Sequence, residues 1–226
     1  MRKLLDVGLP MVALTLLVVG GYWGLFVAPT EREMGEVYRI IYVHVPAAWV
    51  AMIAFTVTMI ASVTYLFNGR WGADILAEAS AEVGVFFSVL VLFTGSVWGK
   101  PTWGVYWTWD PRLTTAAIMT FSFAGYLALR HFVDVPEKRA TWAAVTAVII
   151  YVDIPLVWFS VKWWNTLHQV QSSPQTVSSE MVMPLRISAF AFLFAYLFFT
   201  RLRHQIGRQR LDIELGELPP AGMRGV

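Results

Sequence analysis

Six long apolar segments constrain what this chain can fold into more than any other feature of its sequence. They lie near residues 9–28, 45–67, 82–98, 113–130, 141–160 and 183–200. A helix needs about 20 mostly apolar residues to cross the hydrocarbon core of a bilayer, and backbone polar groups within that core must be satisfied by the protein itself. The sequence therefore predicts an all-α integral membrane protein with six transmembrane helices over residues 1–200, followed by a polar tail over residues 201–226.

Composition agrees with a chain whose main partner is the lipid bilayer. Hydrophobic residues make up 57% of the sequence and charged residues only 14%, whereas a soluble domain has about 25% charged residues. The net charge of +2 is too small to indicate a nucleic-acid partner. The absence of cysteine excludes disulfides, thiolate metal sites and a Cys-x-x-Cys-His haem attachment motif.

The basic residues predict the orientation of the chain in the membrane. Six crossings put both termini on one side, and most of the basic residues fall on that side: Arg2, Lys3, Arg70, Arg130, Lys138, Arg139, Arg201, Arg203, Arg208 and Arg210. The opposite side has fewer, with one more just inside the last segment: Arg32, Arg39, Lys100, Arg112, Lys162 and Arg186. Because cytoplasmic loops are enriched in Lys and Arg, we expect both termini and the tail to be cytoplasmic. We interpret the first segment as a retained helix, since no small-residue cleavage site stands out before Pro29.

The connection between the third and fourth segments is unusually aromatic. It reads Trp98-Gly-Lys-Pro-Thr-Trp103-Gly-Val-Tyr-Trp107-Thr-Trp109-Asp110-Pro-Arg112-Leu-Thr114. This density of Gly and Pro argues against a spanning helix, so we predict a structured loop or an interfacial segment on the outer membrane surface. Because that much ring area would otherwise be an exposed apolar patch, the rings are expected to meet lipid, a large planar ligand or a partner protein. Within the loop, Asp110 is expected to cap the fourth helix, with Pro111 at its first position.

Two histidines are predicted at similar depth on the same outer side. Pro46 suits the first turn of a helix, which places His44 at the mouth of the second span. His168 follows a Trp-rich segment, and Trp164 and His168 would share one face if that segment is helical. Taken singly, each histidine is most simply a hydrogen-bonded interfacial residue. As a pair flanking the Trp-rich loop, they suit axial coordination of one haem iron from both sides, with Arg112, Lys100 or Lys162 near the propionates.

ATP hydrolysis is not expected from this chain. The stretch from Gly95 to Lys100 approaches a P-loop, but its glycine spacing is one residue short. Pro101 also stands where the motif requires Ser or Thr. Any energy for transport must therefore come from a partner.

The motifs together resemble those of the WWD-motif haem-handling proteins of cytochrome c maturation, and most closely the CcmC family. The resemblance rests on the Trp98–Thr114 stretch, on His44-Val-Pro-Ala-Ala-Trp49 and on Lys162-Trp-Trp-Asn-Thr-Leu-His168-Gln169, and it extends to about Arg201. It implies a protein of the bacterial inner membrane that presents haem b on the periplasmic face. It also implies that the chain helps to attach this haem covalently to the haem chaperone CcmE, together with the ATPase CcmA, the permease CcmB and the small membrane protein CcmD.

The same resemblance implies roles for individual residues. His44 and His168 match the axial ligands of a non-covalent, bis-histidine haem b. A second group matches the segment that contacts haem and chaperone: Trp103, Trp107, Trp109 and Asp110. We add four neighbouring residues as candidate haem-binding residues: Trp98, Arg112, Trp163 and Trp164. No catalytic residue is assigned, and whether the chain counts as an enzyme is left open.

Two other functional classes stay open at this stage. A membrane b-type cytochrome for electron transfer usually carries histidine pairs inside its spans, whereas His44 and His168 are predicted at the outer ends. A membrane oligosaccharyltransferase, in which a Trp-Trp-Asp motif also occurs, would need several carboxylates around a divalent metal. The outward loops offer acidic residues without paired spacing: Glu31, Glu33, Glu36, Asp110 and Glu180. Neither class explains both histidines.

Overall fold

The computed structural model describes residues 2–168 and 177–216, and this part of the chain is helical with no β-strand. A π-helical turn, η1 (Trp23–Val27), extends the first helix, and a 3-10 turn, η2 (Glu36–Ile40), leads into the second. The α-helices are α1 (Arg2–Tyr22), α2 (Ile41–Asn68), α3 (Trp71–Trp103), α4 (Pro111–Phe132), α5 (Pro136–Ile150), α6 (Asp153–Trp163) and α7 (Ser179–Glu214).

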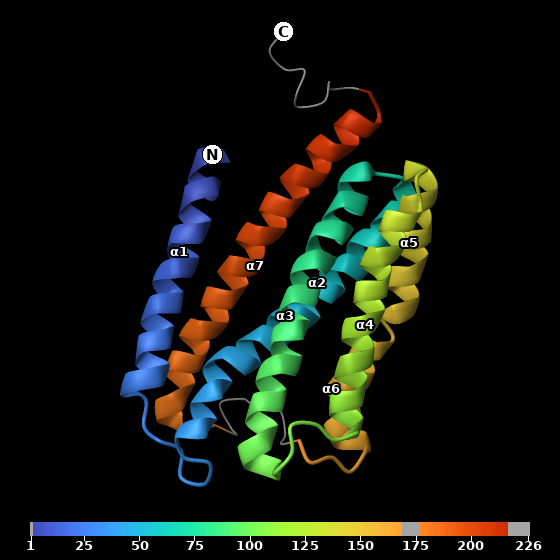
Figure 1. Cartoon of the computed structure of the whole chain (residues 1–226). Coiled ribbons are helices and arrows are strands. Elements are labelled where there is room, and N and C mark those ends of the chain that lie inside the picture. Colours follow the sequence, from blue (N-terminus) through green and yellow to red (C-terminus); the bar gives the residue numbers. More distant parts are fainter. Residues whose placement is uncertain (1, 169–176, 217–226) are drawn as a thin grey trace.

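The helices form a membrane-type bundle, as the apolar segments predict. Five segments of the described chain are long and apolar enough to cross a bilayer: Leu5–Val27, Glu36–Asn68, Trp71–Trp103, Pro136–Trp163 and Ser179–Glu214. The fourth of these combines α5 and α6, which are separated by a turn at Tyr151–Val152. The start of α1 and the end of α7 lie at one end of the bundle, and the α3–α4 connection lies at the other (Figure 1). We call these the terminal end and the aromatic end.

The aromatic stretch is more helical than its Gly and Pro content predicts. The expectation of a loop from Trp98 is wrong for its first six residues, because α3 continues to Trp103. Pro101 cannot donate the usual backbone hydrogen bond to the carbonyl four residues earlier, and α3 ends two residues later, at Trp103. The helix is capped by Gly104, whose positive φ of 81° lets its N–H bond the carbonyl of Lys100.

Two further expectations about helix ends differ from the structure. Pro46 lies inside α2 rather than in its first turn, since η2 leads directly into α2 and the helix starts at Ile41. His44 is therefore a buried residue of the helix wall. At the other terminus, α7 continues beyond Arg201 to Glu214, so the first part of the predicted tail is helical.

Small residues bring α2 and α3 close together. Ala47, Ala51 and Ala54 of α2 are almost fully buried in the main apolar core. On α3, a side-chain carbon at Gly84 would come within 2.8 Å of the Phe55 ring, so only glycine fits that approach. Small residues serve this purpose in membrane bundles, where van der Waals packing drives helix association. On its other side, the Phe55 ring stacks on Phe123 of α4 with ring centroids 3.8 Å apart.

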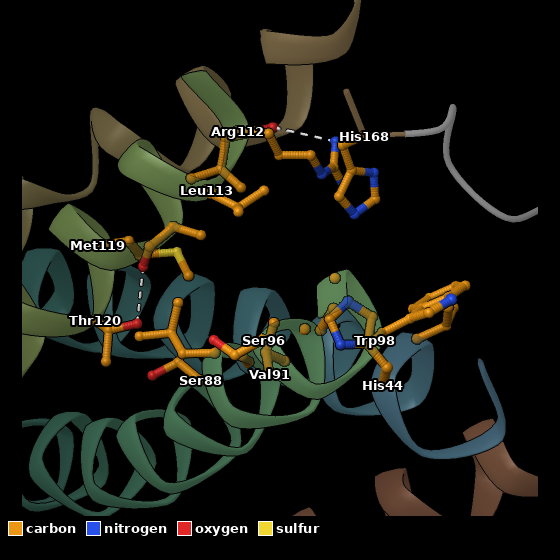
Figure 2. Close-up of a pocket in the computed structure, with 18 of the residues that line it drawn as sticks. His44, Ser88, Val91, Ser96, Trp98, Arg112, Leu113, Met119, Thr120 and His168 are labelled. Carbon is orange, nitrogen blue, oxygen red and sulfur yellow. Dashed lines mark hydrogen bonds between the residues drawn. The ribbon is translucent and has the colours of Figure 1, made fainter. Parts of the chain in front are cut away.

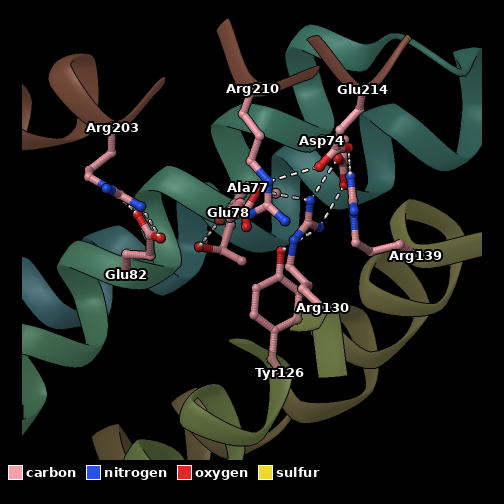
Figure 3. A network of polar contacts seen from close by, with 11 residues as sticks. Asp74, Ala77, Glu78, Glu82, Tyr126, Arg130, Arg139, Arg203, Arg210 and Glu214 are labelled. Atoms are coloured by element: carbon pink, nitrogen blue, oxygen red, sulfur yellow. Dashed lines mark hydrogen bonds and ion pairs between the residues drawn. The ribbon is translucent and has the colours of Figure 1, made fainter. Parts of the chain in front are cut away.

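A cluster of charges holds the terminal end of α3 against α4 (Figure 3). The Arg130 guanidinium donates to both carboxylate oxygens of Asp74 at 2.7 and 2.8 Å, and to Glu78 at 3.1 Å. The side chains of Arg130 and Asp74 are only 3% and 7% exposed. Breaking such a buried pair by removing one partner typically costs about 3–5 kcal/mol. Arg130, which served above only as a marker of orientation, is therefore a structural residue.

Candidate functional site

A mostly apolar cavity of about 120 Å³ lies between helices near the aromatic end. Residues of α2 and α3 line one side, and residues of α4 and α6 line the other, together with His168 (Figure 2). Six of the predicted site residues line this cavity: His44, Trp98, Trp103, Trp107, Arg112 and His168. The structure thus brings together residues from four separate parts of the sequence.

His44 is held in a defined orientation on the wall of α2. Its Nδ1 lies 2.9 Å from Oγ1 of Thr94 on α3, and the residue is only 8% exposed. The indole of Trp98 meets the imidazole edge-on, with ring centroids 5.6 Å apart. A side-chain carbon at Gly95 would come within 3.2 Å of Cε1 of His44, so α3 presents bare backbone to this ring.

His168 faces the cavity from the opposite wall. The imidazoles of His44 and His168 lie on either side of the space, and the Arg112 side chain extends toward His168 (Figure 2). The rings of His168 and Trp103 have centroids 6.4 Å apart. Trp164 and His168 would share a face only in a helix, and that condition is not met, because α6 ends at Trp163 and the backbone of Trp164 is extended.

Asp110 ties the segment that carries His168 to the start of α4. Its carboxylate accepts a hydrogen bond from the backbone N–H of Arg112 at 2.9 Å, which confirms the predicted helix cap. It also accepts from the Thr166 hydroxyl and the Leu167 N–H, each at 2.7 Å. Burial favours the neutral acid, but these hydrogen bonds outweigh it and hold the pKa of Asp110 below its usual value. The Thr166 hydroxyl in turn accepts from the backbone N–H of His168.

The remaining predicted site residues lie outside the cavity lining. Trp109 is 81% exposed and meets Trp107 edge-on, with ring centroids 5.9 Å apart. Trp163 and Trp164 are exposed and pack against each other in the same manner. All three rings are exposed, and Trp109 contacts Trp107 of the cavity lining, so these rings suit contact with a partner or with lipid better than contact with a ligand inside.

Of the three basic residues expected near an anionic ligand, only Arg112 lines the cavity. The Nζ of Lys100 donates to the carbonyl of Gly104 at 2.9 Å and lies over the Tyr106 ring. The Nζ of Lys162 lies 5.7 Å from the centre of the Phe159 ring. Interfacial anchoring, the simpler interpretation of these two lysines, agrees with their surroundings.

Sequence reasoning missed several residues that build the site. Thr94 and Gly95 support His44 but lie 50 and 51 positions away from it in the chain. Trp49 and Trp158 also line the cavity. No local motif marks Thr94 or Gly95, because their roles arise only where α2 and α3 pack together.

Replacing Asp110 with alanine should destabilise the protein by about 2–4 kcal/mol, from the lost helix cap and the lost charge-assisted bonds to Thr166 and Leu167. Because folding lowers the pKa of Asp110, this stabilisation is complete at neutral pH and disappears as the pH falls through the lowered folded value. Thermal unfolding in detergent should therefore separate Asp110→Ala from the parent by more at pH 7 than at pH 3. Asp134→Ala, at an exposed position, is the control. An equal difference at both pH values would contradict the role assigned to the carboxylate.

Comparison with known proteins places the whole bundle in one family. A family model described as Heme exporter protein C matches residues 2–215. Heme exporter protein C of Bradyrhizobium diazoefficiens is 38% identical over 205 residues, which cover 88% of this chain and 78% of that protein. The Escherichia coli (strain K12) protein of that name is 38% identical over 201 residues, which cover 88% of this chain and 82% of that protein. The Rhodobacter capsulatus protein of that name is 33% identical over 210 residues, which cover 89% of this chain and 87% of that protein. The chain therefore belongs to the Heme exporter protein C family.

Proposed function

We propose that this chain handles haem for cytochrome c maturation, holding haem b as cargo between His44 and His168 and presenting it to a haem chaperone. The observation that carries the proposal is the pair of imidazoles on opposite walls of one cavity (Figure 2). Neutral imidazoles on the two faces of a porphyrin supply the axial ligands of six-coordinate iron. Membership of the Heme exporter protein C family supports haem as the ligand.

The residues around the cavity fit a flat, mostly apolar ligand with an anionic edge. Trp98, Trp103 and Trp107 provide ring surface, and Arg112 provides a cation suited to a propionate. The indole N–H of Trp98 is buried and has no hydrogen-bond partner among residues 2–168 and 177–216, so it can serve as a further donor. The cavity is smaller than the roughly 300–1,000 Å³ of ordinary ligand pockets. Binding of a macrocycle therefore requires its walls to part, and the side formed by His168 lies outside any helix.

The exposed rings beside the cavity suit the docking of the chaperone. Trp109 is exposed and contacts Trp107 of the cavity lining, and the exposed Trp163 and Trp164 precede His168 by a few residues in the chain. A partner seated on these rings would meet the haem edge at the cavity mouth. In this proposal the partner is CcmE, to which haem becomes covalently attached, while CcmA, CcmB and CcmD complete the complex and CcmA supplies ATP hydrolysis.

We also propose that the protein crosses the bacterial inner membrane six times, with α4 as a further span beside the five apolar segments. α4 has 22 residues, long enough to cross, and it packs against α3, α5 and α6. The excess of basic residues at the terminal end supports cytoplasmic termini and a periplasmic cavity.

The other two classes gain no support from the geometry. Both cavity-lining histidines lie with Trp103 and Trp107 around one cavity, not in pairs stacked through the spans as in an electron-transferring b-type cytochrome. For glycan transfer, the described residues contain no group of three or more His, Cys, Asp or Glu side chains that could hold a metal ion.

Single cysteines test the orientation, because the parent chain contains none. Tyr106→Cys, at an exposed position of the aromatic end, should react with a membrane-impermeant thiol reagent in cells whose outer membrane is permeable. Asp134→Cys, at an exposed position of the terminal end, should react only after the inner membrane is breached. The reverse pattern would overturn the proposed topology.

Removal of either histidine tests the axial ligands. The purified parent protein should show the absorbance spectrum of low-spin haem. His44→Ala and His168→Ala should each lose haem or give a high-spin spectrum, because a strong-field ligand is missing. His131→Ala, at an exposed position of the terminal end, should match the parent. Unchanged spectra and haem content in both cavity variants would rule out the assignment.

Two tryptophans should separate haem retention from haem delivery. Trp103→Ala removes a ring of the cavity wall whose burial and contacts contribute about 1–3 kcal/mol, so haem retention and covalent delivery should both fall. Trp109→Ala removes an exposed ring, so haem should stay bound while delivery to the chaperone falls. Both quantities can be measured in one assay as haem co-purifying with this chain and haem covalently attached to the chaperone. Trp142→Ala, which removes an exposed ring of α5, is the control. Normal haem delivery from the Trp109→Ala variant would show that the Trp109 ring takes no part in docking.

A further inference from the structure

The hydrogen bonds around His44 identify which of its ring nitrogens carries the proton. The Thr94 hydroxyl lies 2.7 Å from the carbonyl of Leu90 and 2.9 Å from Nδ1 of His44. A carbonyl can only accept, so the single hydroxyl hydrogen of Thr94 is required for the contact with Leu90. The contact with His44 then needs its hydrogen from the imidazole, which places the proton on Nδ1.

The rest of the ring environment directs the second nitrogen to the cavity. Nε2 of His44 makes no hydrogen bond within the described part of the chain, yet it is not sealed from the cavity that His44 lines. Trp98 blocks rotation of the ring from one side, and the backbone at Gly95 supports Cε1. The unprotonated Nε2, with its lone pair, therefore faces the space where a ligand would lie.

We propose that Thr94 is the positioning residue of His44, fixing the Nδ1–H tautomer so that the lone pair of Nε2 faces the cavity. The hydroxyl acts as a relay from the imidazole to the backbone of α3, since it accepts from His44 and donates to Leu90. Histidines that bind metals generally donate their other ring N–H to such a partner, which orients the ring and raises its basicity. The consequence for haem affinity rests on the function proposed above, whereas the tautomer itself is a property of the ligand-free protein.

The relay also gives a reason for glycine at the next position of α3. A methyl group at Gly95 would press on Cε1 of His44, at 3.2 Å, and would turn the ring away from Thr94. Thr94 and Gly95 thus act on adjacent atoms of one imidazole.

Nitrogen NMR of the ligand-free protein, labelled with ¹⁵N only in histidine, tests the tautomer directly. The chain has four histidines, so comparison with His44→Ala assigns the His44 signals. We expect a protonated Nδ1 and an unprotonated Nε2 in the parent and in Thr94→Ser, which keeps the hydroxyl. In Thr94→Val, which keeps the shape but removes the hydroxyl, the Nε2–H form should gain population. Thr115→Val is the control, because Thr115 makes the same bond back to its own helix without touching a histidine.

Haem binding provides the second readout. Loss of the hydrogen-bond partner of a metal-binding histidine typically lowers metal affinity by about 10–100-fold. We therefore expect Thr94→Val to lose about tenfold in haem affinity and to raise the haem reduction potential. Thr94→Ser should stay close to the parent in both quantities. The role of Thr94 would be overturned if the parent protein carried the proton on Nε2 of His44. It would also be overturned if the nitrogen NMR spectrum of Thr94→Val were identical to that of the parent. A tautomer change in Thr94→Val with unchanged haem affinity and potential would support that role and would instead contradict His44 as an axial ligand.

Discussion

The close approach of α2 and α3 is the constraint on which the rest of the structure depends. These helices form an antiparallel hairpin joined through Gly69, whose positive φ of 64° allows the tight turn. Ala54 and Gly84 keep the seam between them free of bulky side chains. The seam sets His44 against Thr94 and Gly95, so the geometry of the cavity wall follows from packing in the middle of the bundle. A larger residue at Gly84 would meet Phe55 and would separate the helices that hold this histidine.

The two histidines are supported by different kinds of structure. His44 is buried in a helix and held by a side chain, a ring and bare backbone of α3. His168 lies beyond the end of α6, where the Asp110 carboxylate anchors its segment through Thr166 and Leu167. This asymmetry suits the proposed handling of haem as cargo, because His168, whose segment is held by a few hydrogen bonds, can move away from the iron while the helices stay packed. The aspartate of the aromatic motif thus anchors the segment that carries His168.

The opposite end of the bundle is stabilised by charge rather than by rings. Arg130 joins α4 to Asp74 and Glu78 of α3, and Arg203 of α7 pairs with Glu82 (Figure 3). The more exposed Arg203–Glu82 pair contributes at most about 1 kcal/mol, whereas the buried pair at Arg130 cannot lose a partner without a large penalty. Because these ion pairs hold the helices together at the terminal end, the walls of the cavity would separate at the aromatic end in the proposed function.

The sequence by itself determined the membrane-type helical class, the Trp-rich motif and the two candidate histidines, because hydrophobic length and motif spacing are local properties. It also predicted Asp110 as a helix cap, which depends only on its neighbours along the chain. It did not predict that α3 continues to Trp103, since Gly and Pro disfavour a helix interior but do not fix the residue at which a helix ends. Only the tertiary structure decided that Arg112 lines the cavity while Lys100 and Lys162 do not, and that Thr94 meets His44. Those contacts join residues far apart in the chain, and they exist only because helices that share no local signal pack face to face.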